Sequence, residues 1–327
     1  MSNNNSAEEY IATRNAIGDE LYVQMKLNSN IFALSADLID STKLTKINDE
    51  FSDRVINVGV AETSLVQIAS GLEQVGFIPV ITSFAAFSPG RNWDFIRTSV
   101  CYSNRNIKIF STHVGLGVGE DGATHQAMED IAIMRVIPNL VVLNPCDYYE
   151  AKNAIKYALS IDSPVYIRFT RQPVKSYCFN NIEFTKSIEI KRNNSIDKNV
   201  KISILSTGCM LETAEYLYEN IQKNNSRFTC SSLNNFGSIK PIDEKKILEL
   251  KHESDIFITL EDTQLFGGFG SSVLEVICES HIPVIRIGME DSFGESGDYL
   301  SLFAKYRLDN EGVLKRVLDK LKSQLIS

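Results

Sequence analysis

The sequence predicts an α/β protein of two domains, each with a mostly parallel β-sheet flanked by helices. Three observations lead to this prediction. Short runs rich in β-branched residues alternate with segments of helical periodicity, which is the pattern of β-α-β units. The alternation breaks over residues 173–200, a polar and asparagine-rich stretch, and then resumes. The 327 residues also exceed the roughly 150 residues of a typical domain.

The elements of the first series follow one another closely. A helix is expected over residues 8–25, because Ile17, Leu21 and Met25 recur every four residues. A second helix over residues 63–75 has one apolar face and ends before a glycine, as helices often do. The remaining helices are expected over 93–102, 126–136 and 148–160. Strands are expected over 31–35, 55–58, 77–82, 107–110, 140–143 and 165–168.

The second series repeats the same alternation. Its strands are expected over 201–205, 228–233, 256–260 and 284–287. Its helices are expected over 210–222, 270–280 and 312–325. We therefore expect a first domain over residues 1–175, a connection over 176–200 and a second domain over 201–327.

The composition excludes several classes of protein. The formal net charge is −8 and the pI is about 5.2, so binding to nucleic acid or to an anionic membrane is not expected. No apolar run approaches the ~20 residues needed to span a bilayer, and the first residues have no features of a signal peptide. The six cysteines form no CxxC pair, which predicts neither a zinc knuckle nor a disulfide framework. These features predict a cytoplasmic protein.

The candidates for a binding site are the polar and aromatic residues that follow the expected strands. In parallel α/β sheets, ligands bind beyond the carboxyl ends of the strands. The residues at these positions are Asp37, Ser41, Glu62, Phe84, Phe87, His113, His125 and Arg171.

Several of these candidates have a structural explanation beside a functional one. A carboxylate in a first helical turn is stabilised by the helix dipole, which would explain Glu62. The alternative is a carboxyl placed to hold a ligand nitrogen. Phe84 and Phe87 are either core residues or aromatics that stack on a planar ring. Arg171 is either a solvated charge or an anion-binding group.

The stretch 112–126 is the least ordinary part of the sequence. His113 and His125 lie in it, separated by four glycines and an acidic pair. Glycine lets a loop approach a ligand closely, and histidine titrates near neutral pH, so the stretch favours a functional loop. It lacks the lysine of a GxxxxGK[ST] phosphate loop. With no third His or Cys nearby, it predicts no metal site.

Taken in order, several motifs resemble the transketolases. In the first series they are 53–62 (DRVINVGVAE), 84–87 (FAAF), the two-histidine loop 112–126 and 168–172 (RFTRQ). In the second series they are 205–208 (LSTG), 239–243 (IKPID), 260–262 (LED), 267–270 (GGFG) and 291–296 (DSFGES). The resemblance is to the C-terminal half of a transketolase. It implies a pyrimidine-binding domain of the thiamine-diphosphate-binding fold, followed by a transketolase C-terminal domain.

The resemblance implies thiamine diphosphate as the cofactor. Glu62 would hydrogen-bond the pyrimidine N1′, and a partly buried carboxyl can hold the proton that this role requires. Phe84 and Phe87 would pack on the aminopyrimidine ring, and Asp37 would lie close to the cofactor. The cofactor supplies the electron sink, whereas the protein supplies placement.

The resemblance also implies contacts with a sugar substrate. His113 and His125 would contact the substrate and, with Glu62, take part in catalysis. Asp121 would sense the configuration of a hydroxyl of the donor. The terminal phosphate of the sugar would be held by Arg14, Ser41, His113 and Arg171. A phosphorylated substrate is therefore expected.

One expected motif is missing, and two positions depart from the family pattern. The sequence has no Gly-Asp-Gly followed by Asn, the motif that holds Mg²⁺ and the diphosphate in such enzymes. These groups are expected from an N-terminal partner subunit in an α2β2 assembly, with no metal ligands from this chain. Gly90 stands where a third aromatic is common, and Thr263 stands where a histidine is common.

The function implied is that of the C-terminal subunit of a split transketolase. Such an enzyme transfers a two-carbon ketol unit from a ketose phosphate to an aldehyde acceptor. One alternative is the β subunit of a 2-oxo-acid dehydrogenase, which has a similar length; the two-histidine loop argues against it. Another is a non-catalytic assembly subunit that has kept the fold. The presence of Glu62 together with the histidines and Asp121 argues against that.

Overall fold

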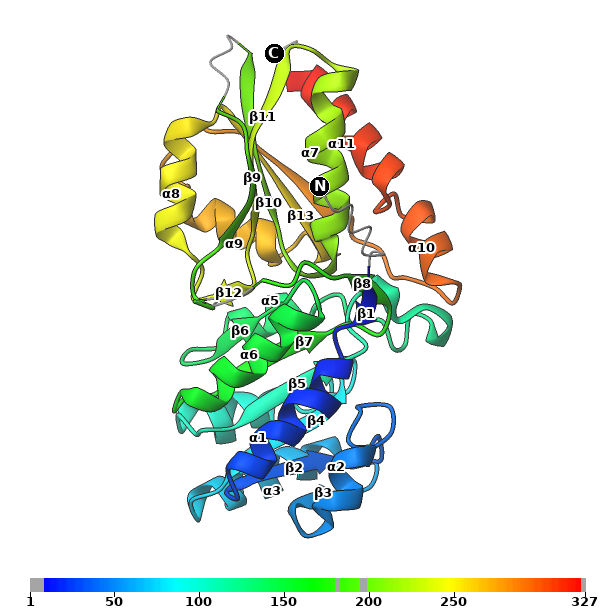
Figure 1. Cartoon of the computed structure of the whole chain (residues 1–327), viewed down its shortest axis with the longest axis vertical. Helices are drawn as coiled ribbons and strands as arrows, with labels where there is room; N and C mark the ends of the chain where they lie inside the picture. The colour runs from blue at the N-terminus through cyan, green and yellow to red at the C-terminus, as the bar shows by residue number, and fades with distance from the viewer. Residues whose placement is uncertain (1–8, 180–182, 195–198, 325–327) are drawn as a thin grey trace, which may run out of the picture.

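The chain folds into two large β-sheets that lie one above the other along the long axis of the molecule, with helices around each (Figure 1). The arrangement is that of a computed structural model, which describes residues 9–179, 183–194 and 199–324. Parallel pairing predominates in both sheets. The predicted fold class is confirmed.

Among the described residues, the first sheet has seven strands in the order β12-β6-β7-β5-β4-β2-β3, and only β12 is antiparallel to its neighbour. The strands are β2 (Ile31–Ser35), β3 (Val55–Asn57), β4 (Ile78–Phe84), β5 (Lys108–Thr112), β6 (Val141–Leu143), β7 (Val165–Phe169) and β12 (Ser238–Lys240). The helices are η1 (Ile17–Leu21), α1 (Tyr22–Leu27), α2 (Thr45–Glu50), η2 (Ser52–Arg54), α3 (Glu62–Gln74), α4 (Trp93–Phe95), η3 (Ile96–Tyr102), η4 (Leu116–Asp121), α5 (Asp130–Arg135) and α6 (Tyr148–Ser160).

Within the described ranges, the second sheet has five strands in the order β14-β13-β10-β11-β9. The strands are β9 (Ile188–Arg192), β10 (Val200–Ser206), β11 (Phe228–Asn235), β13 (Ile256–Gln264) and β14 (Val284–Met289). The helices are η5 (Gly208–Met210), α7 (Leu211–Asn224), α8 (Glu244–Glu253), α9 (Phe269–Val276), α10 (Tyr299–Lys305) and α11 (Asn310–Gln324).

A small antiparallel sheet pairs β1 (Tyr10–Ala12) with β8 (Pro173–Lys175). The helix predicted over residues 8–25 is therefore wrong in its first part, and residue 8 lies outside the described residues. Helical structure begins at residue 15, close to the point where the apolar periodicity of Ile17 and Leu21 begins. The preceding residues form a strand because β8 supplies their hydrogen-bond partners.

Besides β1 and β8, two further strands of the described residues, β9 and β12, were not predicted. β9 lies within the stretch 176–200 that was expected as a connection, and it pairs antiparallel with β11 at the edge of the second sheet. β12 follows β11 in the chain, yet it pairs with β6 of the first sheet. The connection between the two sheets is therefore partly ordered as a strand, and the second part of the chain contributes to the first sheet.

One of the hydrophobic clusters among the described residues extends across both sheets. Val142 and Tyr166 of the first sheet belong to the same cluster of buried residues as Leu205, Phe257 and Phe269 of the second part. Full burial of a large apolar side chain contributes roughly 1.5–3 kcal/mol. The junction between the sheets is therefore a packed interior, which fixes one sheet relative to the other.

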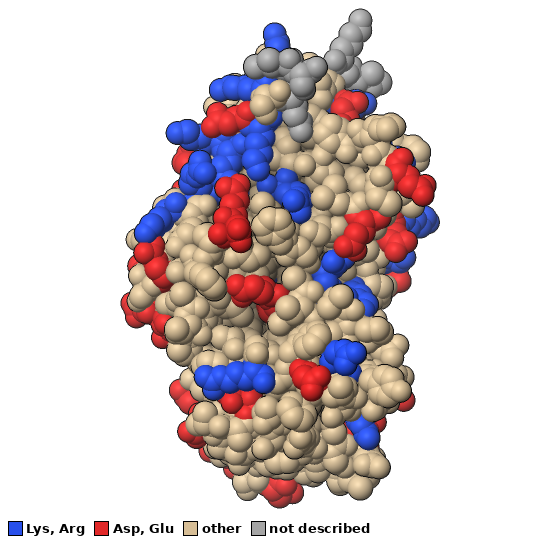
Figure 2. Space-filling view, turned by 180° about the vertical axis from the view of Figure 1, so that it is seen from behind, with Lys and Arg blue, Asp and Glu red and all other residues tan. Residues whose placement is uncertain are grey.

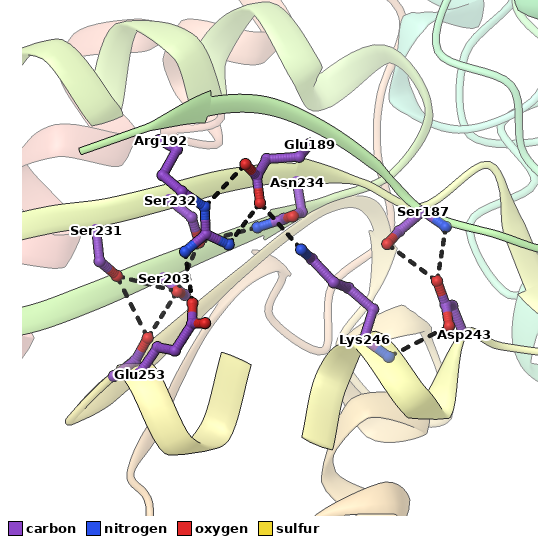
Figure 3. A network of polar contacts seen from close by, with 11 residues as sticks. Ser187, Glu189, Arg192, Ser203, Ser231, Ser232, Asn234, Asp243, Lys246 and Glu253 are labelled. Atoms are coloured by element: carbon purple, nitrogen blue, oxygen red, sulfur yellow. Dashed lines mark hydrogen bonds and ion pairs between the residues drawn. The ribbon is translucent and has the colours of Figure 1, made fainter. Parts of the chain in front are cut away.

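Figure 3 shows how β9 is connected to α8 by charged side chains. Arg192 on β9 donates to Glu189 at 2.8 Å and to Glu253, the last residue of α8, at 2.6 Å. Lys246 donates to Glu189 at 2.9 Å, and Asp243 caps α8 by accepting from the Lys246 main-chain nitrogen at 3.2 Å. Partly exposed ion pairs contribute only about 0–1 kcal/mol each, so this network chiefly sets the position of the edge strand.

Charged side chains are unevenly spread over the face shown in Figure 2. Lys and Arg gather toward the end formed by the second sheet, whereas much of the remaining surface of this face carries few charges. Over the described residues, large apolar side chains that are exposed include Val60, Phe266 and Phe293. None of the helices described is both long and apolar enough to span a bilayer.

Glu150 is a buried carboxyl at the junction of the two sheets. From α6 it accepts hydrogen bonds from Asn235 Nδ2 of β11 at 3.0 and 3.1 Å and from the Cys146 main-chain nitrogen at 2.6 Å. Burial raises the pKa of Glu150 to about 7, and burial also raises the pKa of Glu261 to about 7. Both carboxyls therefore titrate near neutral pH in the folded chain.

We expect Glu150 to add stability to the folded chain as the pH falls from 7 toward 4.5. The pKa of Glu150 is raised above its unfolded value of 4.5, so the folded state takes up a proton first. Stability is therefore gained as the pH falls through 7 and toward 4.5. Glu150→Gln should reduce this slope by roughly 1 kcal/mol per pH unit, measured by urea unfolding at several pH values. The exposed Glu219→Gln on α7 is the control, and an equal slope in both variants would contradict the expectation.

Candidate functional site

The carboxyl ends of β4 and β5 bring together a cluster of two phenylalanines and two histidines. Phe84 ends β4 and His113 follows β5, and their ring centroids lie 3.7 Å apart. Phe87 stacks against Phe84 with a centroid distance of 5.7 Å, and His125 meets Phe87 edge-on at 5.2 Å. Four of the residues selected from the sequence therefore meet at the sheet edge where ligands of α/β proteins bind.

Arg14 reaches this cluster from the segment before η1. Its Nη1 donates to His113 Nε2 at 3.2 Å and to the main-chain carbonyl of Ser41 at 3.3 Å. A guanidinium can only donate, so Nε2 of His113 accepts and the ring proton lies on Nδ1. Nδ1 is 2.8 Å from the Thr112 hydroxyl, whose oxygen accepts the hydrogen bond from Nδ1–H. His113 is therefore held in one tautomer.

His113 is neutral at physiological pH. Its pKa is lowered to about 3, first by burial and then by the charges of Arg14 and Arg171. Its backbone has φ +55°, in the left-handed region that residues with a side chain seldom adopt. Such strained positions gather at functional sites. The neutral ring can accept a hydrogen bond, as it does from Arg14, but with so low a pKa it is a weak base and not an anchoring charge.

A cleft of about 240 Å³ opens beside the cluster, and both Arg14 and Arg171 line it. Arg171 Nη1 donates to the Val118 carbonyl at 2.5 Å and lies 3.4 Å from the carboxylate of Asp121. Burial and the charge of Arg171 lower the pKa of Arg14, so the two guanidiniums act on each other across the cleft. The lining also includes the acidic residues Glu120 and Asp298, so its charges balance, and the two arginines are the groups in the cleft that suit an anion.

Glu62 lies at the other end of the site, at the start of α3, and is 6% exposed. Its Oε1 lies 3.0 Å from Nη1 of Arg91, and the Arg91 guanidinium lies 4.2 Å from the centroid of the Phe87 ring. Asn92 Nδ2 donates to the Glu62 carbonyl at 3.0 Å. Glu62 is thus connected to the aromatic cluster through Arg91, a residue that the sequence analysis did not select.

Asp37 lies at the exposed rim of the site. Its main-chain nitrogen donates to Asn57 Oδ1 at 3.0 Å, and Asn57 Nδ2 donates back to Asp37 Oδ1 at 3.4 Å. Asn57 Oδ1 also accepts from the Gly59 nitrogen at 3.1 Å. Asn57 therefore orders the turns after β2 and β3, a role that no spacing in the sequence indicated.

The second part of the chain holds the two-histidine loop in place. Gly115 has φ +68°, and a Cβ at this position would lie 1.9 Å from Oδ2 of Asp262, so only glycine fits. Gln126 Nε2 donates to the Glu295 carbonyl at 2.9 Å. The loop is therefore positioned from both sheets, although both of its histidines come from the first series.

A buried ion-pair network lies behind this loop. Arg168 on β7 lies 2.7 Å from Asp130 and 3.0 Å from Asp262, and the three side chains are each 1% exposed. Tyr166 donates to Asp130 at 2.6 Å, and Asn144 accepts from Arg168 at 3.1 Å. Burial alone lowers the pKa of Arg168, but the two carboxylates raise it above its ordinary value. The network joins the first sheet to β13 of the second.

The structure explains the two departures from the family pattern. At Gly90 a Cβ would lie 2.0 Å from the carbonyl oxygen of Ala86, so an aromatic side chain would require a different backbone. Thr263 is buried, and its hydroxyl donates to the buried carboxyl of Glu261. Thr263 therefore serves the interior of the second part.

In the described part of the chain, no group of three or more His, Cys, Asp or Glu side chains is placed to hold a metal ion. The cysteines are free thiols, and Cys101 and Cys230 are buried. Burial raises the pKa of Cys101 and that of Cys230 to about 12. These two thiols stay protonated at neutral pH, so they are not nucleophiles.

Two family models match most of the chain. Residues 9–176 match the family model of the transketolase pyrimidine binding domain, and residues 194–313 match that of the transketolase C-terminal domain. A putative transketolase C-terminal section of Methanocaldococcus jannaschii is 38% identical over 317 residues, which are 96% of this chain and 98% of the relative. A 6-deoxy-6-sulfo-D-fructose transketolase subunit of a Clostridium species is 32% identical over 88% of each chain.

A solved structure shows the same architecture. It is described as a split gene transketolase in an inactive β4 tetramer, with a TM-score of 0.83 and 36% sequence identity. The match covers 95% of this chain and 99% of that one. The chain therefore belongs to the transketolase family, of which it carries the pyrimidine-binding and C-terminal domains.

Proposed function

We propose that this chain is the C-terminal subunit of a split transketolase that transfers a two-carbon ketol unit from a ketose phosphate to an aldehyde acceptor. The observation that carries the proposal is one sheet edge at which Glu62, an aromatic pair and a neutral His113 lie beside a cleft with two arginines. The similarity to a transketolase C-terminal section supports the division of the enzyme into two chains.

The residues present fit the aminopyrimidine ring of thiamine diphosphate. A carboxylate lies beside an aromatic face, and that face already carries a flat nitrogen-bearing cation, the guanidinium of Arg91. Glu62 would hold the pyrimidine N1′, with Phe84 and Phe87 against the ring and Asp37 near the rim. When bound, the cofactor would supply a nucleophilic carbon and an electron sink for breaking the C2–C3 bond of the ketose.

The histidines would act on the substrate. His113 would accept a hydrogen bond from a substrate hydroxyl at Nε2, the atom that accepts from Arg14 in this structure. His125 is held by a contact of 2.9 Å between its Nδ1 and the Thr124 hydroxyl, and its ring faces the same aromatic pair. Asp121, at the mouth of the cleft, would contact the hydroxyl of the donor whose configuration matters.

The cleft would hold the terminal phosphate of the sugar. Arg14 and Arg171 would supply the charge from the lining of the cleft, while Ser41 and His113, which both contact Arg14, would supply polar contacts beside it. Charge-assisted hydrogen bonds of this kind are the strong ones in proteins. A phosphorylated ketose is therefore the substrate class that we propose.

Arg14→Met is expected to raise the KM for a phosphorylated ketose roughly 10- to 100-fold, because a hydrogen bond to a charged group contributes about 1.5–3 kcal/mol. The KM for the same ketose without phosphate should change little. Steady-state kinetics of the reconstituted enzyme measure both values. Arg54→Met is the control, because Arg54 donates to the Met25 carbonyl at 2.9 Å and does not line the cleft. Equal losses for both substrates would contradict a phosphate-binding role.

A partner chain would complete the active site. In this proposal residues 1–175 form the pyrimidine-binding domain, 176–200 the connection and 201–327 the C-terminal domain. The Mg²⁺ ligands and the diphosphate site would come from an N-terminal subunit in a cytoplasmic α2β2 assembly. The weakly charged surface of Figure 2 and the exposed apolar side chains support association with other subunits.

Reconstitution tests the proposed function. The chain would be mixed with an N-terminal subunit that carries the Gly-Asp-Gly motif, thiamine diphosphate and Mg²⁺, and ketol transfer from xylulose 5-phosphate to an aldose would be measured. We expect turnover by the mixture and none by either subunit alone. Decarboxylation of pyruvate without ketol transfer would indicate a 2-oxo-acid dehydrogenase instead. A chain that left cofactor affinity unchanged would be an assembly subunit.

A further inference from the structure

Arg91 occupies the place that the proposed function gives to the aminopyrimidine ring. We propose that this arginine closes the cofactor site of the empty subunit, and that its side chain must leave Glu62 and Phe87 before thiamine diphosphate binds. The inference rests on the proposed function, because it takes these two residues as the pyrimidine site. It adds a residue that sets how tightly and how fast the cofactor binds.

The planar guanidinium of Arg91 contacts both Glu62 and Phe87. Nη1 of Arg91 lies 3.0 Å from Oε1 of Glu62, and Cζ of Arg91 lies 4.2 Å from the centroid of the Phe87 ring. Phe84 also stacks on Phe87, so little of that ring is left for another flat group. A guanidinium and an aminopyrimidine are both flat and rich in nitrogen, and they would require the same carboxylate oxygen and the same aromatic face.

The contact is built so that only a side chain has to move. The main-chain nitrogen of Arg91 donates to the Phe87 carbonyl at 2.9 Å, and the neighbouring Asn92 donates to Glu62 and to Ser88 at 3.0 and 3.2 Å. The backbone is therefore fixed on both sides of the arginine. The Arg91 side chain itself is 53% exposed, so it can move from Glu62 and Phe87 directly into solvent.

The contact with Arg91 stabilises the carboxylate of Glu62 when no cofactor is bound. Glu62 is 6% exposed, and a buried carboxylate without a partner is costly. Arg91 provides the partner until the cofactor takes its place. Because Arg91 itself is half-exposed, its ion pair and its cation–π contact are each modest, and the arginine can be displaced at a moderate cost in affinity.

The consequence is competition between a side chain and a cofactor. When only a fraction of the molecules is open, the apparent dissociation constant is the intrinsic one divided by that fraction. We expect Arg91→Ala to bind thiamine diphosphate roughly 5- to 10-fold more tightly than the wild type, for a site that is open about a tenth to a fifth of the time.

The experiment uses the complex reconstituted with the N-terminal subunit and Mg²⁺. Calorimetric titration with thiamine diphosphate gives the dissociation constant for the wild type, Arg91→Ala and Arg91→Gln. Stopped-flow fluorescence gives the association rate, which should reach a plateau with cofactor concentration in the wild type and stay linear in Arg91→Ala, because opening then no longer precedes binding. Circular dichroism establishes that each variant is folded.

Arg97→Ala is the matched control. Arg97 is an exposed arginine of η3, six residues along the chain, and its removal changes the net charge equally. Its affinity should equal that of the wild type. If the wild-type complex binds the cofactor and Arg91→Ala binds it no more tightly, the inference is wrong while the proposed function stands. If neither complex binds thiamine diphosphate, the proposed function itself fails.

Discussion

Glu62→Gln is expected to lower ketol transfer by the reconstituted enzyme by about 10²-fold or more, the range in which a positioned proton donor contributes to catalysis. The amide has nearly the shape of the carboxyl, so the helix start of α3 and the contact with Phe87 through Arg91 need not change. The amide cannot exchange a proton with the pyrimidine N1′, which is the step assigned to Glu62. Turnover of xylulose 5-phosphate measures the loss.

Glu73→Gln is the matched control for this substitution. Glu73 lies on the same helix α3 and is also paired with an arginine, Arg105, at 2.8 Å, but it lies outside the cluster at the sheet edge. We expect its activity to stay within about twofold of the wild type, as for most substitutions away from a site. Full activity in Glu62→Gln would remove the main support for the proposed chemistry.

Arg168→Met is expected to destabilise the chain by about 3–5 kcal/mol, the cost of breaking a buried ion pair. The substitution would leave Asp130 and Asp262 buried and without a cation, at 1% exposure each. Because total stabilities are about 5–15 kcal/mol, a large part of the chain's stability depends on this one side chain. Urea unfolding measures the difference.

Two further variants identify the cause of that loss. Arg192→Met also removes an arginine with two carboxylate partners, but that arginine is 29% exposed, so the loss should be about 1 kcal/mol or less. The triple variant Arg168→Met, Asp130→Asn and Asp262→Asn removes the uncompensated charges and should recover part of the stability. A single variant Arg168→Met as stable as Arg192→Met would show that the buried charges carry little energy.

The parallel strands of the two sheets could be predicted because most are short, largely buried runs such as 31–35 or 256–260. β1 could not, because Tyr10–Ala12 has no pattern of its own and is extended only where β8 pairs with it. β9 lies in a polar stretch, β12 has only three residues, and both pair with strands that are distant in sequence. Local periodicity carries no signal for such pairings.

Some residues of the candidate site could likewise be predicted from the sequence, and others could not. Phe84 and His113 follow strands, and the rule that ligands bind at the carboxyl ends of strands was enough to place them together. Arg91 follows no strand, and its contact with Glu62 depends on how a loop folds over a helix start. Arg168 was visible only as part of a motif, because its contact with Asp262 spans 94 positions of the chain.

β12 has a consequence for how the protein is made. Ser238 and Lys240 pair with Leu143 and Val142 at the end of the first sheet. A ribosome must therefore translate well past β7, the last parallel strand of that sheet, before β6 acquires a neighbour on its second side. Until then the nascent chain presents an unpaired strand edge, which favours pairing with other emerging chains. Co-translational protection by chaperones would matter most in this interval.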